Sequence, residues 1–163
     1  IEIIKHDAPY LTLASLLCVV VFIVIALKRV QISAVVVCGL VWAVLVMVGI
    51  AALLEIKINF FNFIVLPLTF GIGVDYGINV AMRIHEEGPM SAIYAIRHTG
   101  GAVVLCSATT IIGYFVLTTA ANQALATFGL AAVIGEIACI TSAILLVPAI
   151  IVFSHKFREG RRS

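Results

Sequence analysis

The polar residues of this chain divide it into five long apolar stretches. Each stretch is long enough to cross a bilayer, which takes roughly 17–25 residues in an α-helix. The stretches cover residues 11–27, 32–54, 60–82, 101–118 and 124–153. Charged or turn-forming residues separate them, and the Gly-Pro pair at Gly88 should end the third helix. The pattern therefore predicts an all-α membrane protein with five transmembrane helices.

The segments outside the apolar stretches have predicted roles as well. Residues 1–10 are expected to form an extracytoplasmic lead-in, and residues 154–163 a basic cytoplasmic tail. Between the third and fourth stretches, apolar residues recur at near-helical spacing and predict a short amphipathic helix over residues 89–99 on the cytoplasmic face. These residues are Met90, Ile93, Tyr94 and Ile96. Pro67 and Pro148 predict kinks in the third and fifth helices.

The composition excludes several classes of protein. The chain is 63% hydrophobic and 11% charged, with a mean hydropathy of +1.24, whereas soluble domains carry about 25% charged residues. The net charge of +2 does not indicate a nucleic-acid partner, because the charges gather at the ends of the apolar stretches. The cysteines form no Cys-x-x-Cys pair and the histidines have no partner at ligand spacing. Neither a disulfide framework nor a metal site is expected.

The distribution of Lys and Arg predicts how the chain crosses the membrane. If the N-terminus is outside, eight of the ten Lys and Arg residues face the cytoplasm, and only Lys5 and Lys57 face outward. The eight are Lys28, Arg29, Arg83, Arg97, Lys156, Arg158, Arg161 and Arg162. We therefore expect the N-terminus outside and the C-terminus in the cytoplasm. Because no signal peptide is visible, an upstream segment of a larger protein is expected to deliver this start.

Asp75, inside the third apolar stretch, is the strongest candidate for a functional residue. An acidic side chain near the bilayer centre costs at least ~2.5–3.5 kcal/mol on insertion scales. On a helix it shares a face with Gly71 and Asn79, and the Gly73-x-x-x-Gly77 pattern permits close helix packing. We expect Asp75 in a crowded helix contact, where a carboxyl group can load and release a proton. The alternative is a buried acid that only hydrogen-bonds a partner helix.

A second acid and a row of hydroxyl groups are further candidates. Glu136 lies near the middle of the fifth stretch, where it could share a proton path with Asp75 or simply bond a hydroxyl or a backbone carbonyl. The fourth stretch carries hydroxyl groups at helical spacing, which could relay protons or merely hold helices together. They are Ser107, Thr110, Tyr114 and Thr118. No nucleophile–base pair is visible, so an enzyme is not expected.

The segment Gly71-Ile-Gly-Val-Asp75-Tyr76-Gly77 carries a resemblance to a known family. With Ser107–Phe115 and Phe128-Gly129-Leu, it resembles the second-half membrane domain of a resistance-nodulation-division (RND) exporter of the MMPL branch. The resemblance covers Ala8 to Phe153. It implies helices eight to twelve of twelve, that is, one half of a pseudo-symmetric RND-type bundle. The N-terminal half and the large extracytoplasmic domains of the same transporter are then partners of this domain; a first half would look alike.

The resemblance also implies a function. Asp75 would be the proton carrier of a relay and Tyr76 its hydrogen-bonding companion, with Glu136 and Thr110 as further candidates from the residues themselves. The protein would export a hydrophobic or lipid-like substrate from the bacterial inner membrane, with protons as the coupling ion and no cofactor. Membrane lipids are expected contacts, and a homo-oligomer stays open.

Three other functions remain open on the same residues. A sterol- or lipid-sensing domain shares the five helices but needs no titrating acid. A protein-secretion motor of the same fold would differ in its extracytoplasmic domain. A purely structural subunit would tolerate Asp75→Asn.

Overall fold

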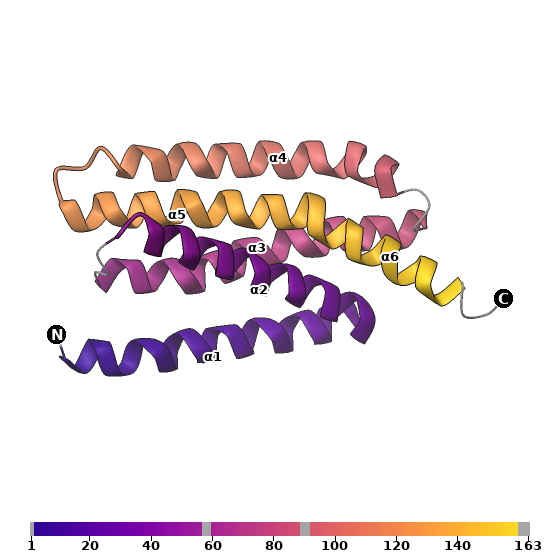
Figure 1. Ribbon diagram of the computed structural model, residues 1–163, viewed down its shortest axis with the longest axis horizontal. Helices are drawn as coiled ribbons and strands as arrows, with labels where there is room; N and C mark the ends of the chain where they lie inside the picture. Colours follow the sequence, from indigo (N-terminus) through magenta and orange to yellow (C-terminus); the bar gives the residue numbers. More distant parts are fainter. Residues whose placement is uncertain (1, 57–59, 89–91, 160–163) are drawn as a thin grey trace.

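The computed structural model describes residues 2–56, 60–88 and 92–159, with the side chains of 10–56, 64–88, 93–94, 96–97 and 99–157. Helices account for nearly all of these residues, and no strand occurs among them (Figure 1). The elements are α1 Glu2–Leu27, α2 Val30–Leu53, α3 Phe60–Glu87, α4 Ala92–Leu117, α5 Gln123–Thr141, the π-helix η2 Ser142–Leu146 and α6 Val147–Glu159.

The structure confirms an all-α membrane protein with five helices long and apolar enough to span a bilayer. The spans are Tyr10–Leu27, Val30–Leu53, Ile64–Glu87, Thr99–Leu117 and Gln123–Phe157, the last formed by α5, η2 and α6 together. The third helix runs five residues further than expected. Arg83 and Glu87, one turn apart, form an ion pair of 2.7 Å on this extension, and Gly88, with a left-handed φ of +91°, ends it.

The predicted lead-in and interfacial helix are not separate elements. Residues 2–10 form the first turns of α1, and residues 92–99 form the first turns of α4. The prediction of a separate helix over 89–99 is therefore wrong for its described part, while residues 89–91 lie outside the described residues. The physical reason is that Gly100-Gly101 lacks a helix-ending proline, so the backbone hydrogen bonds continue from the amphipathic turns into the apolar span.

Helix α3 is the central element of the bundle and packs against α1, α2, α4, α5 and α6. Its buried face is apolar, with Val65, Val74, Val80 and Ile84 almost fully enclosed. The outer faces of the other helices are equally apolar; on α1, for example, Phe22 is 60% exposed. This arrangement suits a bilayer, where lipid covers the outside and tight packing holds the inside.

The last span bends where a proline interrupts its backbone ladder. Pro148 has no N–H to donate, and the residue before it, Val147, donates its N–H to the Ser142 carbonyl five residues back instead of four. The Ser142 hydroxyl also donates to the Gly39 carbonyl at 2.6 Å, which ties the bend to α2. As a result α6 leaves the α5 axis and crosses toward α2 and α3 (Figure 1). α3, by contrast, runs through Pro67 as one helix.

The contact between α4 and α5 yields a first prediction. A Cβ added at Gly129 would lie 2.7 Å from the Tyr114 carbonyl oxygen, whereas one added at Gly113 meets nothing within 4 Å. Gly129→Ala should therefore lower the free energy of unfolding by about 1–3 kcal/mol, the usual cost of overpacking. Gly113→Ala should leave it unchanged or raise it slightly, because alanine favours helix. Unfolding of the full-length protein in mixed micelles measures both; equal losses in the two variants would contradict the packing described.

Candidate functional site at the centre of the bundle

Asp75 and Tyr76 lie at mid-membrane depth but on different sides of α3. Asp75 is at the midpoint of the span Ile64–Glu87 and is exposed on the surface of the bundle. Tyr76 is buried, with 4% of its surface exposed. Successive residues of an α-helix point about 100° apart, so the two side chains face different neighbours. The family resemblance implied that Tyr76 is the hydrogen-bonding companion of Asp75. In the structure the tyrosine has a different partner.

That partner is Glu136. The Tyr76 hydroxyl donates a hydrogen bond of 2.5 Å to the Glu136 Oε1 atom, and this bond joins α3 to α5. Glu136 is 3% exposed, so the bond lies wholly inside the helix bundle. A distance this short is typical of a hydroxyl that donates to a carboxylate. The sequence left open whether Glu136 bonds a hydroxyl group or a backbone carbonyl, or shares a proton path with Asp75. In the structure Glu136 accepts a hydrogen bond from the hydroxyl group of Tyr76, the residue after Asp75.

Helix α4 adds hydroxyl groups to this pair. Thr110 lies within reach of the Tyr76 hydroxyl, and its own hydroxyl donates to the Cys106 carbonyl at 3.0 Å. Tyr114, one turn further, lies within the electrostatic field of Glu136. Ser107 shares this face of α4 and is completely buried, with no hydrogen-bond partner among the described residues. We call Tyr76, Glu136, Thr110 and Tyr114 the buried polar cluster, after its buried Tyr76–Glu136 pair; Thr110 and Tyr114 are half-buried. Three helices, α3, α4 and α5, supply it.

The four residues predicted to pack helices fall into two groups. A Cβ added at Gly73 would lie 2.7 Å from the Cys139 Sγ atom, and one at Gly77 would lie 3.1 Å from Val36. These two glycines therefore bring α3 close to α5 and α2. Gly71 has open space in front of it, and Asn79 is exposed.

Asp75 lies on the same side of α3 as Gly71 and Asn79, so the expected crowded contact around it is not found among the described residues. Gly71, Asp75 and Asn79 follow one another at helical spacing along one side of α3, and all three are exposed. We call this side the Asp75 face. The close-packing glycines occupy the opposite side, because two residues along a helix turn the backbone by more than half a revolution.

The Asp75 face has a direct physical consequence. A carboxyl and an amide group at the bilayer centre are costly in contact with lipid, and such groups normally face other protein or a water-filled cavity. The described residues of this chain leave the face open. The Asp75 face thus differs from the apolar exterior seen on α1.

Sequence reasoning found the members of the buried polar cluster but missed how they pair. Tyr76 and Glu136 are sixty positions apart, and neither spacing nor composition brings them together. One signal was available: Tyr76 follows the packing glycine Gly73 by three positions, so it had to point into the bundle. No group of metal-ligating side chains occurs among the described residues.

The Tyr76–Glu136 bond yields a second prediction. Tyr76→Phe leaves a buried carboxyl group without its donor and should lower the free energy of unfolding by about 1.5–3 kcal/mol. Glu136→Gln keeps an oxygen that accepts from Tyr76 and should cost less. Thr109→Val removes an exposed hydroxyl that bonds only its own helix, and serves as the control, with an effect within about 0.5 kcal/mol. Unfolding of the full-length protein in detergent measures all three; if Tyr76→Phe were as harmless as Thr109→Val, the bond would not hold α3 to α5.

Comparisons with known proteins agree with this architecture. Over 161 residues the chain is 27% identical to a membrane protein of Methanocaldococcus jannaschii, and the match covers 95% of this chain and 42% of that relative. The chain thus spans less than half the length of the relative. No solved structure gives a significant match. The model of the MMPL family matches residues 1–162, and the chain therefore belongs to the MMPL family of RND-type membrane transporters.

Proposed function

We propose that this domain couples proton movement to the export of a hydrophobic or lipid-like substrate, with Asp75 as the proton carrier. The observation that supports it most directly is the position of Asp75: mid-membrane, exposed on the central helix, and beside an open face. An ionisable group in that position is typical of proton and ion pathways. The substrate class follows from the family alone.

The proposed coupling works through the Asp75 face. In the whole transporter this face meets the other half of the membrane domain. Protonation of Asp75 removes a charge from the contact, and the two halves then settle into a different packing. A proton that crosses down the membrane potential supplies about 2.3 kcal/mol per 100 mV, which is enough to shift such an equilibrium about fiftyfold.

The buried polar cluster supports this coupling as a set of positioning residues. Tyr76 follows Asp75 directly, and its bond to Glu136 fixes this turn of α3 against α5. A change at Asp75 therefore moves α3 together with α5 rather than α3 alone. Thr110 lies beside the tyrosine on the α4 side. In this proposal Glu136 and Tyr76 transmit the movement, and the proton is carried by Asp75.

The setting of the domain is part of the same proposal. The Lys and Arg distribution supports an N-terminus outside and a C-terminus in the cytoplasm. The proposed location, the inner membrane of a bacterium, rests on the family resemblance alone. The N-terminal half and the extracytoplasmic domains act as partners, and a homo-oligomer is compatible with the exposed apolar faces. The proposal assigns the domain no enzymatic activity, no metal and no cofactor besides the coupling proton.

Asp75→Asn is the third prediction. Asparagine keeps the shape and the hydrogen-bonding atoms but cannot carry a proton, so substrate export by the full-length protein should fall to the background level. Glu86→Gln removes an exposed carboxylate from the end of the same helix and should leave export unchanged. Export is measured with insertion and expression checked for each variant. Normal export by a well-folded Asp75→Asn protein would favour a structural or sensing role and would end the proposal.

A further inference from the structure

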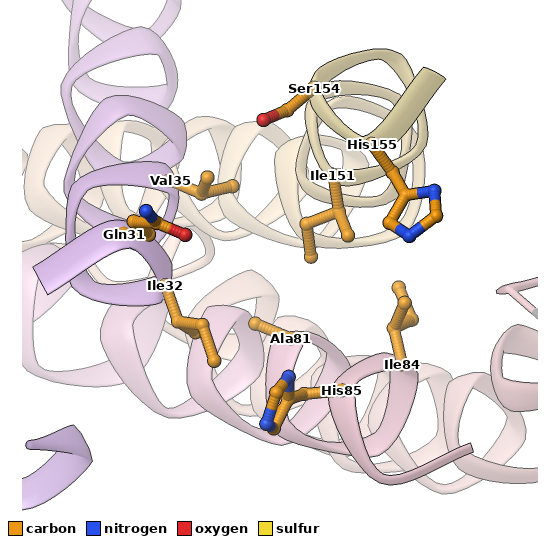
Figure 2. Close-up of a pocket in the computed structure, with 9 residues that line it drawn as sticks. All are labelled: Gln31, Ile32, Val35, Ala81, Ile84, His85, Ile151, Ser154 and His155. Carbon is orange, nitrogen blue, oxygen red and sulfur yellow. The ribbon is translucent and has the colours of Figure 1, made fainter. Parts of the chain in front are cut away.

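A cavity opens between α2, α3 and α6 at one end of the bundle. Its volume is about 340 Å³. Figure 2 shows the residues that line it. It exists because α6, after the bend at Pro148, crosses α2 and α3 at an angle and does not fill the space between them (Figure 1). We call this end, where exposed Lys28, Arg29 and Lys156 lie, the basic end.

Much of the cavity wall is apolar. Ile32 of α2, Ala81 and Ile84 of α3 and Ile151 of α6 line it, and Ala81 and Ile84 have no solvent-exposed surface of their own. A small hydrophilic ion has no partner against such walls. A hydrocarbon chain, or the glycerol and first methylene groups of a lipid, would be well accommodated.

The mouth of the cavity is polar. Gln31, His85, Ser154 and His155 surround the same opening, and they come from the same three helices (Figure 2). A second cavity of about 360 Å³ shares Gln31, Ile32 and His85 with the first and adds Arg29. The two cavities therefore adjoin, and together they form one depression. The apolar walls belong to the first cavity and Arg29 to the second, and amide, hydroxyl and imidazole groups lie between them.

The charge at this mouth is positive. Glu86 and Glu87, the acids at the end of α3, line neither cavity, and Arg83 pairs with both, at 4.0 Å and 2.7 Å. Arg29 has no such acid among the residues that line the two cavities. Basic pockets between membrane helices are a common form of site for phosphate-bearing lipid headgroups.

We propose that this depression binds one anionic phospholipid from the leaflet at the basic end. Its phosphate lies between Arg29 and His85, and its glycerol and upper chain lie against Ile32, Ile84 and Ile151. The cavity sits at the ends of three membrane spans, where a bilayer lipid has its headgroup, and this position together with the apolar walls favours a lipid over free phosphate. The bound lipid fills the space that the bent α6 leaves open. This inference does not depend on the proposed transport function.

The fourth prediction tests it with the full-length protein in a neutral detergent. Phosphatidylglycerol should raise the thermal midpoint and be retained in native mass spectra, whereas phosphatidylcholine or inorganic phosphate at equal concentration should do neither. One cation near a lipid headgroup contributes about fivefold in binding, so Arg29→Gln should weaken phosphatidylglycerol binding about fivefold. Lys156→Gln, which removes a cation of the same end that lines neither cavity, should change it less than twofold.

A second pair of variants tests the cavity itself. Ser154→Trp places a large ring at the mouth and should abolish the lipid-specific shift, while Val152→Trp, on another side of α6, should keep it. Three results would overturn the proposal: equal binding of phosphatidylglycerol and phosphatidylcholine, a comparable shift with inorganic phosphate, or equal losses from Arg29→Gln and Lys156→Gln. A Ser154→Trp protein that folds and binds the lipid as well as Val152→Trp would overturn it too.

Discussion

A polar group at the centre of a membrane needs a partner, because the hydrocarbon core supplies none. Two acidic side chains of this structure meet the need for a partner in different ways, and the packing of the bundle depends on that difference. Glu136 has a partner within the chain, the Tyr76 hydroxyl, in a bond that lies fully inside the helix bundle. Asp75, the residue before Tyr76 on α3, is exposed on an open face of the bundle. The first acid stabilises this half of the bundle, and the second requires something outside the described chain.

The central position of α3 connects these two requirements. Gly73 and Gly77 let α3 approach α5 and α2 closely, and this approach carries Tyr76 to Glu136. The same close packing turns Asp75 outward, since the helix period fixes the angle between the side chains. One short sequence, from Gly71 to Asn79, thus builds a packed side and a polar outer side. In the proposed function, the outer side is the contact with the other half of the transporter.

Much of this could be predicted from the sequence, because bilayer thickness restricts what an apolar stretch can do. The five spans, the acid in the third and the packing glycines were all visible. The separate interfacial helix was a wrong prediction, since amphipathic spacing shows where a helix forms but not whether it stops at Gly100-Gly101. The crowded contact expected around Asp75 is not formed within the described residues, because a small-residue pattern marks a packed side without excluding a polar one. The Tyr76–Glu136 bond and the cavity beside α6 depend on contacts between distant segments, which no local pattern contains.

We propose that Asp75, and not Glu136, changes its protonation state when the protein works. Infrared difference spectra of the reconstituted full-length protein, recorded across a pH step, measure this directly through the carbonyl band of a protonated carboxyl group. The account predicts a band that disappears in Asp75→Asn and persists in Glu136→Gln. A band that persists in Asp75→Asn and disappears in Glu136→Gln would contradict it and would make the buried polar cluster the site of proton exchange.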